Sequence, residues 1–258
     1  MIKIAINGFG RIGRAAFKAA MEKKNIKVAA INDLTDTKTL AHLLTYDTVY
    51  GKYDKKVGYT KDSVKVNGQN YRVFSERDPA NLPWKKLGID VVLECTGFFT
   101  KSELAKVHVT KAGAKGVIIS APGKSEDIKT YVLGVNQDKI GKDSVISNAS
   151  CTTNCIAPVI NVLNNAFGIK KALMTTIHAY TSTQKLVDGP HKDLRRGRAA
   201  AQNMVPTSTG AAIATTKTIP QLKGKFDGIS VRVPLIVGSL SDITVLLKRK
   251  PVKPQVNY

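Results

Sequence analysis

The chain has 258 residues, of which 43% are hydrophobic and 23% are charged; these values are typical of a soluble globular protein and allow one large domain or two ordinary ones. It has no apolar run of about eighteen residues and no signal-peptide pattern at its start, so we expect a cytoplasmic protein without a membrane span. Three cysteines exclude a disulfide framework, and 40 Lys and Arg residues against 19 Asp and Glu residues give a net charge of +21.

The positive charge is open to two interpretations. A field of this sign attracts phosphate groups on metabolites, nucleic acids or lipid headgroups. The lysines are scattered, however, and few aromatic residues are interleaved with them. This distribution favours a solvated lysine-rich surface over a dedicated nucleic-acid interface.

The N-terminal segment has the pattern of a dinucleotide-binding unit. Residues 2–7 (IKIAIN) are predicted to form a buried strand, residues 11–24 a helix, and residues 26–31 a second strand that ends at Asn32-Asp33. Between the first strand and the helix lies a G-x-G-x-x-G motif at residues 8–13. The motif alone would indicate only a tight turn, but this context favours a dinucleotide site.

Each residue of the motif has a physical role in such a site. Gly8 allows the tight turn, Gly10 lets the backbone approach a pyrophosphate, and Gly13 lets the helix pack closely against the strand. The helix N-terminus would then hold the phosphates. Asp33 can accept hydrogen bonds from both hydroxyls of an adenine ribose, and its carboxylate would repel a 2′-phosphate.

The following segments continue the same fold. Residues 63–74 form a hairpin pattern around Asn67-Gly68, and residues 90–94, 116–120 and 145–147 are predicted strands. Strands that alternate with helices predict an α/β doubly wound parallel sheet.

Two further expectations concern the strand ends of this sheet. Thr100 and Glu103 could form a capping box for a helix that extends to residue 112. Gly97, Ser120 and Cys151 all follow strand ends, so they could share one ligand crevice.

Cys151 is a candidate nucleophile. Ser150 is a good N-cap residue, and the apolar residues of segment 156–167 follow a helical period that ends at Gly168. Cys151 would then lie at a helix N-terminus, where free N–H groups favour a thiolate. It could instead be a small buried hydrophobe, the usual fate of a free cysteine. A zinc site is disfavoured because the three cysteines supply fewer than four ligands.

His178 closes a predicted strand at residues 172–178. A single histidine is often structural, but a nucleophilic cysteine needs a basic or cationic neighbour, and His178 could supply it. The long loop at residues 181–206 carries Arg195, Arg196 and Arg198, whose planar guanidinium groups suit a phosphate.

Two later features also suit anions. Residues 207–210 precede a predicted helix at 211–217, which offers a second helix N-terminus. Arg232 lies in a predicted strand at 229–233, and a buried arginine needs an anionic partner such as a substrate phosphate.

Five segments together resemble the phosphorylating glyceraldehyde-3-phosphate dehydrogenase family. They are INGFGRIGR at 6–14, ASCTTN at 149–154, HAYTSTQ at 178–184, HKDLRRGRAAAQNMVPTSTGAA at 191–212 and GISVRVP at 228–234. The resemblance extends from Ile2 to about Val245. It implies a Rossmann-type doubly wound NAD-binding domain at residues 1–150, followed by an α+β catalytic domain at residues 151–258.

The resemblance also implies a reaction. Cys151 would add to the aldehyde of D-glyceraldehyde 3-phosphate, and His178 would lower the thiol pKa and take the proton as hydride leaves for NAD. Inorganic phosphate would then attack the thioester on Cys151 and release 1,3-bisphosphoglycerate, a step of glycolysis and gluconeogenesis. The family is cytoplasmic and homotetrameric, and its long loop reaches the cofactor pocket of the neighbouring subunit.

The family's binding positions are carried over as follows. The NAD contacts are Gly8, Gly10, Arg11, Ile12, Gly13, Asp33, Arg77 and Ser120. The attacking phosphate would contact Ser150, Thr152, Thr209 and Gly210, the C3 phosphate would contact Thr181 and Arg232, and Arg196 lies in the loop that serves both. Asp33-Leu34 and Pro190 resemble the NAD-specific members, and no metal is implied.

The family pattern continues beyond the predicted strand at residues 242–247. The continuation would hold further strands, the asparagine that anchors the nicotinamide amide, and a C-terminal helix that packs on the cofactor domain. Residues 250–258 resemble the opening of a further helix. The simplest explanation is a truncated gene or an incomplete reading of one, which leaves only the N-terminal part of the catalytic domain. The alternative is a real short protein, whose sheet would have an unpaired edge and an uncovered apolar groove that favour aggregation or association.

Two other functions stay open. One is an erythrose-4-phosphate dehydrogenase, a related activity with the same cysteine and histidine. The other is a catalytically inactive fragment that binds polyanions through the +21 charge, for which RNA binding would depend steeply on salt.

Overall fold

A computed structural model describes residues 1–250 of the chain, which forms two compact units. The first unit comprises residues 1–130 and 140–148. The second comprises residues 131–139 and the chain from Ala149 onward. The short segment 131–139 therefore belongs to the second unit, although a strand of the first unit follows it. The expectation that residues 250–258 open a further helix lies outside the described residues, apart from Lys250.

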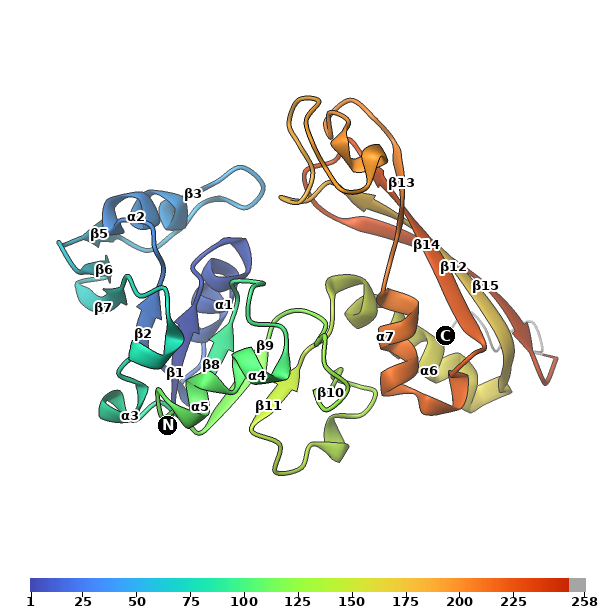
Figure 1. Cartoon of the computed structure of the whole chain (residues 1–258), viewed down its shortest axis with the longest axis horizontal. Coiled ribbons are helices and arrows are strands. Elements are labelled where there is room, and N and C mark those ends of the chain that lie inside the picture. The colour runs from blue at the N-terminus through green and yellow to red at the C-terminus, as the bar shows by residue number, and fades with distance from the viewer. Residues whose placement is uncertain (251–258) are drawn as a thin grey trace. The chain divides into compact units, whose positions relative to one another are not determined.

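The first unit is built on a nine-stranded sheet with the strand order β10-β11-β9-β8-β1-β2-β7-β6-β5 (Figure 1). The pairs from β10 to β7 are parallel, and β7, β6 and β5 form antiparallel pairs. A separate two-stranded sheet joins β3 and β4. The strands are β1 (Ile2–Asn7), β2 (Ile26–Asn32), β3 (Tyr46–Asp47), β4 (Gly51–Lys52), β5 (Val57–Tyr59), β6 (Ser63–Val66), β7 (Gln69–Phe74), β8 (Val91–Glu94), β9 (Gly116–Ile119), β10 (Lys129–Thr130) and β11 (Val145–Ser147). The predicted doubly wound sheet is confirmed.

Helices cover this sheet on both faces. They are α1 (Arg11–Met21), α2 (Thr37–Thr45), α3 (Trp84–Leu87), α4 (Ser102–Ala105) and α5 (Val107–Thr110). Ile4 and Ile6 of β1 belong to an apolar cluster with Phe17 of α1, whereas Ala5 belongs to a second cluster with Trp84 of α3. Because side chains alternate along a strand, the two clusters lie on opposite faces, and this explains why the consecutive residues Ile4, Ala5 and Ile6 of β1 are all apolar and buried.

The hairpin at Asn67-Gly68 has the predicted form, with a positive φ of 49° at Asn67 and 84° at Gly68. The predicted capping box at Thr100 and Glu103 is wrong. Helix α4 begins at Ser102, whose backbone N–H donates to Ser125 Oγ over 2.9 Å and whose hydroxyl donates to Asp127 over 2.6 Å. The hydrogen bonds at the N-terminus of α4 are therefore made with residues distant in the sequence, and not within a local capping box.

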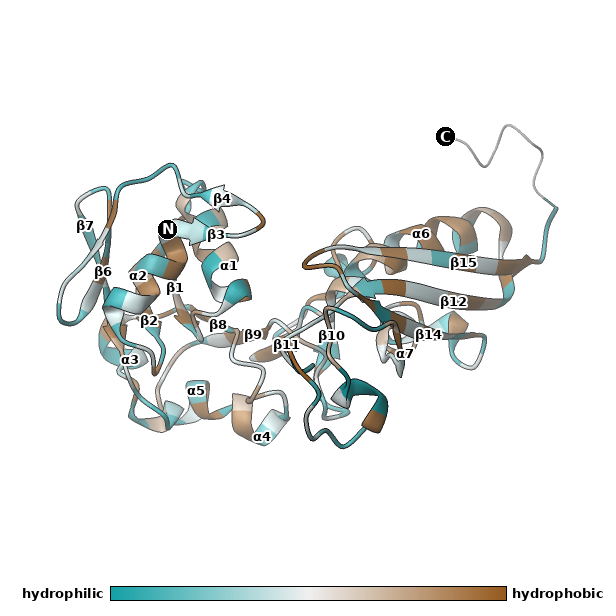
Figure 2. Cartoon of the chain, turned by 90° about the horizontal axis from the view of Figure 1, so that it is seen from above, coloured by the Kyte–Doolittle hydropathy of each residue, from teal (hydrophilic) through white to brown (hydrophobic). Residues whose placement is uncertain are grey.

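The second unit is a four-stranded sheet with two helices on one face. Its strands have the order β13-β14-β12-β15, in which β12 and β14 are parallel and the two outer pairs are antiparallel. The elements are α6 (Cys151–Phe167), β12 (Ile169–Ala179), β13 (Val205–Ser208), α7 (Ala211–Thr218), β14 (Phe226–Val233) and β15 (Ser239–Leu247). In Figure 2, α6 runs alongside β12 and β15. Strand β13 begins inside the segment that was predicted to be loop as far as Pro206.

The helices cover only one face of the second sheet. Ile156 and Ile160 of α6 and Ala211 of α7 pack against Met174 and Phe226 of the sheet. Leu173, Ile177, Ile229, Leu240 and Leu246 are on the other face and are 40 to 64% exposed. This uncovered apolar face bears on the proposed assembly described below.

No helix within residues 1–250 is long and apolar enough to cross a membrane.

Candidate active site

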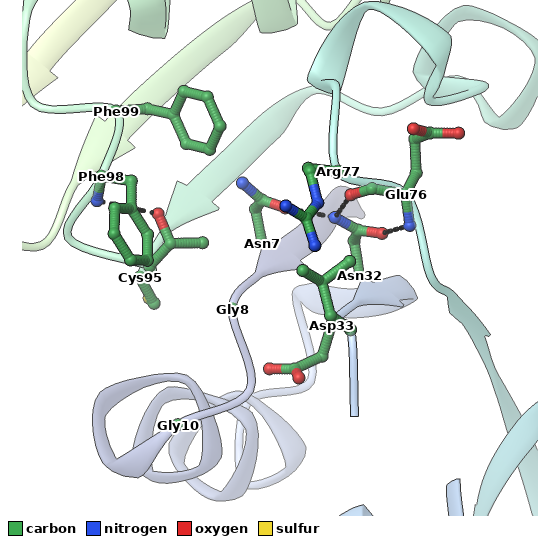
Figure 3. Close-up of a pocket in the computed structure, with 12 residues that line it drawn as sticks. Asn7, Gly8, Gly10, Asn32, Asp33, Glu76, Arg77, Cys95, Phe98 and Phe99 are labelled. Atoms are coloured by element: carbon green, nitrogen blue, oxygen red, sulfur yellow. Dashed lines mark hydrogen bonds between the residues drawn. The ribbon is translucent and has the colours of Figure 1, made fainter. Parts of the chain in front are cut away.

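The first unit contains a cavity of about 620 Å³ at the carboxyl ends of its central strands (Figure 3). Strand β2 pairs with one side of β1 and β8 with the other, so the order in which parallel strands are added to the sheet reverses at β1. A ligand site is expected at such a switch point, where the loops that follow neighbouring strands diverge. The cavity is lined by Asn7, Gly8, Gly10, Asn32, Asp33, Leu34, Glu76, Arg77, Cys95, Thr96, Phe98 and Phe99.

The glycine turn after β1 is closely packed against backbone at Gly8 and Gly13, where a side chain has no room, and is open at Gly10. Gly8 has a φ of +90°, and a Cβ there would lie 2.7 Å from the backbone nitrogen of Thr96. A Cβ on Gly13 would overlap the carbonyl oxygen of Gly8. No atom lies within 4 Å of the corresponding position on Gly10, which faces the cavity. The turn therefore presents bare backbone to a ligand.

Asp33 supports the same turn. One carboxylate oxygen accepts the backbone N–H of Phe9 over 2.6 Å, and the other accepts that of Thr35 over 2.9 Å. Asp33 therefore joins the loop after β2 to the glycine turn and also places negative charge at the cavity wall.

A buried polar network forms the floor of the cavity. The Asn7 side chain donates to Glu94 over 2.5 Å. It also accepts from Asn32 over 2.7 Å, and Asn32 in turn forms hydrogen bonds with the backbone N–H and carbonyl oxygen of Glu76 (Figure 3). Behind it, Trp84 donates to His108 Nδ1 over 3.0 Å. Because the indole can only donate, His108 carries its proton on Nε2, which lies 3.2 Å from Glu94.

The predicted cofactor residues divide into two groups. Gly8, Gly10, Asp33 and Arg77 line the cavity. Arg11, Ile12 and Gly13 belong to the first turn of α1, where Arg11 pairs with Asp47 over 3.1 Å, and Ser120 forms a hydrogen bond with Cys95 of the cavity wall. The sequence-based prediction did not include Phe98, which is 79% exposed and lines the cavity with Phe99. The adjacent aromatic pair after β8 was the available signal.

The second unit places Cys151 at the first position of α6. Ser150 is the N-cap, and its hydroxyl accepts the backbone N–H of Thr153 over 3.1 Å. The helix then continues to Phe167 through Pro158 and ends at Gly168, as predicted. The Cys151 side chain is accessible to solvent. It is therefore not the small buried hydrophobe that the sequence left open.

Cys151 and His178 form a reactive pair. The Sγ atom lies 3.5 Å from His178 Nε2. This hydrogen bond, aided by the Thr152 backbone and side chain, lowers the pKa of Cys151 to about 7 although burial opposes the shift. The same contact raises the pKa of His178, while burial and the Arg232 charge act in the other direction. At neutral pH a large fraction of Cys151 is therefore thiolate, the nucleophilic form.

Arg232 lies beside this pair because of strand register. Parallel pairing of β12 and β14 puts His178 opposite Arg232. The guanidinium Nη1 lies 2.8 Å from His178 Nδ1 and donates to the carbonyl oxygen of Ala179 over 3.0 Å. Burial and the positive charge of Arg196 both lower the pKa of Arg232, so the site contains two mutually repelling cations. An anion between them would relieve that repulsion.

The other predicted phosphate residues surround two helix termini and the long loop. Arg196 binds the Thr207 hydroxyl and lies 3.9 Å from Asp193. Thr209 Oγ1 accepts the backbone N–H of Ala211, and Gly210 is the N-cap of α7. Thr152 is 6% exposed, and the Thr181 hydroxyl contacts Thr183. No hydrogen bond within residues 1–250 joins Thr181 or Thr209 to Cys151.

Known proteins are similar in sequence to both units of the chain. The profile of the glyceraldehyde 3-phosphate dehydrogenase NAD binding domain matches residues 2–102, and that of the C-terminal domain of the same enzyme matches residues 150–258. Glyceraldehyde-3-phosphate dehydrogenase of Streptomyces coelicolor is 56% identical over 259 residues, which cover 99% of this chain and 76% of the relative. The enzyme of Borreliella burgdorferi is 55% identical over 262 residues, which cover 99% of this chain and 78% of the relative. The enzyme of Geobacillus stearothermophilus is 53% identical over 258 residues, which cover 99% of this chain and 76% of the relative.

Proposed function

This chain belongs to the glyceraldehyde-3-phosphate dehydrogenase family, and from this premise we propose that it oxidises D-glyceraldehyde 3-phosphate to 1,3-bisphosphoglycerate with NAD and inorganic phosphate. The observation that carries the proposal is the contact of 3.5 Å between Cys151 Sγ and His178 Nε2 at a helix N-terminus, beside Arg232. An activated thiolate, a base and an anion site are what an aldehyde phosphate requires.

NAD suits the cavity of the first unit. The side-chain-free turn at Gly8, Gly10 and Gly13 admits a pyrophosphate to the N-terminus of α1, and the exposed ring of Phe98 suits an adenine face. The Asp33 carboxylate suits ribose hydroxyls and disfavours a 2′-phosphate. Arg11, Ile12, Arg77 and Ser120 complete the proposed set. When bound, NAD supplies the acceptor for the substrate hydride.

The residues of the second unit carry out the remaining steps. The Cys151 thiolate forms a carbon–sulfur bond to the aldehyde carbon, and His178 Nε2 first protonates and then deprotonates the resulting oxygen. Loss of hydride from that carbon leaves a thioester on Cys151. Inorganic phosphate attacks the thioester carbonyl, and the carbon–sulfur bond breaks to return the thiolate.

Two anion sites hold the phosphates in this proposal. Thr181 and Arg232 bind the C3 phosphate of the substrate, and Arg196 serves both sites. Ser150, Thr152, Thr209 and Gly210 bind the attacking phosphate at the N-termini of α6 and α7. The repulsion between Arg196 and Arg232 supports the first of these sites.

The proposed reaction predicts a two-stage time course of NADH absorbance. Without phosphate, substrate and NAD should give a burst close to one NADH per active site and then a slow phase, because the thioester is not released. Adding phosphate should restore continuous turnover. Erythrose 4-phosphate serves as the control aldehyde and should react more slowly. Turnover that does not depend on phosphate would contradict the acyl transfer step.

We also propose that the chain associates with copies of itself as a homotetramer. We further propose that it works in the cytoplasm, where reducing conditions keep Cys151 from being oxidised to a disulfide. The uncovered sheet face with Leu173, Ile229 and Leu240 supports association, because exposed apolar area of this kind commonly marks an interface. Sedimentation velocity should show a species four times the chain mass, and a Leu240→Lys variant should shift it toward smaller species. A wild-type monomer at micromolar concentration would contradict the assembly.

A further inference from the structure

Glu94, the last residue of β8, has a buried carboxylate that the proposed reaction does not use. Its side chain is inaccessible to solvent, and within residues 1–250 no lysine or arginine forms an ion pair with it. Burial of a carboxylate is costly unless a cation neutralises it or its oxygens accept hydrogen bonds. The hydrogen-bond donors around Glu94 are therefore the guide to its role.

Each oxygen of this carboxylate faces two donors. One oxygen accepts the backbone N–H of Thr96 over 2.8 Å and also accepts the Thr96 hydroxyl. The other accepts the Asn7 side chain over 2.5 Å and lies 3.2 Å from His108 Nε2. This nitrogen carries the ring proton, because the indole of Trp84 donates to Nδ1. Four donors therefore stabilise the buried carboxylate in place of a lysine or arginine.

Two of these donors also contact the aromatic residues of the cavity wall. The Thr96 hydroxyl, which donates to Glu94, accepts the backbone N–H of Phe98 over 3.1 Å. The ring of His108 packs edge-on against the ring of Phe99, with the two centroids 6.0 Å apart. Phe98 and Phe99 both line the cavity, and each of them contacts a group that is bound to Glu94.

We propose that Glu94 is a positioning residue for the cofactor, whose carboxylate fixes the turn at residues 95–99 and thereby the places of Phe98 and Phe99 in the cavity. The inference rests on the proposed function, because it takes NAD as the ligand and Phe98 as the surface for its adenine. It adds that NAD affinity depends on a buried carboxylate that is not among the residues that line the cavity.

The position requires a carboxylate because all four neighbouring groups are donors. Glutamine has nearly the same shape, but it has one acceptor oxygen and one NH2 group that can only donate. If the amide oxygen faces Thr96, the NH2 group meets the donors of Asn7 and His108. If the amide is turned over, the backbone N–H of Thr96 loses its acceptor. His108 cannot adapt, because a proton on Nδ1 would oppose the indole N–H of Trp84. Glu94→Gln should therefore loosen the turn with little change in side-chain volume.

The test is a double-mutant cycle on NAD affinity, measured by calorimetric titration of Glu94→Gln, Phe98→Ala and the double variant. Glu94→Gln should weaken NAD binding roughly tenfold when Phe98 is present and less than about twofold when it is alanine, because the side chain that Glu94 positions is then gone. Titration with 5′-AMP, which carries the adenine half alone, should show the same pattern. If Glu94 only stabilises the fold, NAD binding should weaken equally in both backgrounds, and that result would overturn the inference.

Two variants of His108 test the same contacts with the carboxylate intact, and they carry the test if Glu94→Gln does not fold. His108→Gln retains an acceptor for Trp84 and a donor for Glu94, so NAD affinity should stay within about twofold of the wild type. His108→Leu removes both groups and should weaken NAD binding about fivefold or more, with a smaller loss in the Phe98→Ala background. Equal NAD affinity of the two His108 variants would contradict the proposed role of Glu94.

These titrations do not depend on the dehydrogenase reaction. Equal losses of NAD affinity on Glu94→Gln in the two backgrounds, in a protein that forms NADH normally, would reject this inference alone. A loss that depends on Phe98, in a protein that binds NAD but forms no NADH from glyceraldehyde 3-phosphate, would reject the proposed reaction and leave the role of Glu94 standing.

Discussion

A Cys151→Ser variant is expected to lose NADH formation by about 10⁴-fold or more. A serine hydroxyl has a far higher pKa than a thiol. In the wild type, His178 Nε2 lies 3.5 Å from Cys151 Sγ, and this contact stabilises the thiolate and lowers the pKa of Cys151 to about 7. The substituted oxygen would remain protonated at neutral pH. It would therefore add too slowly to the aldehyde to form an acyl intermediate. Burst and steady-state rates of NADH absorbance are the measurements.

The control for this experiment is Cys155→Ser, one helical turn further along α6. Cys155 is also exposed and lies in the same helix, but no hydrogen bond within residues 1–250 joins it to His178. The control should retain burst and turnover, and both variants should keep the Tm of the wild type. If Cys151→Ser retained turnover, the nucleophile would be another group, and the proposed role of His178 in activating Cys151 would also be wrong.

Features of this chain that depend on neighbouring residues in the sequence could be predicted. The N-cap at Ser150, the stop at Gly168 and the turn at Asn67-Gly68 each use contacts within a few residues, and the structure has all three. The glycine turn after β1 was also predicted, because its residue types are required by close backbone approach and not by distant side chains. Cys151 at a helix N-terminus follows from the same local rules.

Features that depend on distant segments could not be predicted in this way. The N-terminus of α4 is satisfied by Ser125 and Asp127, so a plausible local box at Thr100 was not formed. Strand β13 exists because it pairs with β14, and its own residues carry no strong strand pattern. The contact between His178 and Arg232 joins residues 54 positions apart. Residue types indicated a base and an anion-binding arginine, but only the register of β12 and β14 brings the two side chains into contact.

A Gly13→Ala variant is expected to have the largest effect on the fold of the first unit. The added methyl would overlap the carbonyl oxygen of Gly8 and lie 3.2 Å from Ile6 Cγ2. Gly8 cannot move aside, because its N–H donates to the Asn32 carbonyl oxygen over 2.8 Å and the Thr96 backbone lies so close that it leaves no room for a Cβ on Gly8. Helix α1 would have to move off β1, which we expect to cost about 3 kcal/mol or more. Urea unfolding measures this free energy, and calorimetric titration with NAD should show the loss of binding.

Gly10→Ala separates close packing from access of the ligand. Gly10 has a negative φ of −68°, and no atom lies within 4 Å of the position that its Cβ would take. The free energy of unfolding of the Gly10→Ala variant should therefore stay within about 0.5 kcal/mol of the wild-type value. The new methyl does face the cavity, so NAD affinity should still fall. Equal stability of Gly13→Ala and Gly10→Ala would show that α1 can move, and the packing argument for the third glycine would then be wrong. Unchanged NAD affinity in Gly10→Ala would instead show that the ligand backbone does not approach this turn.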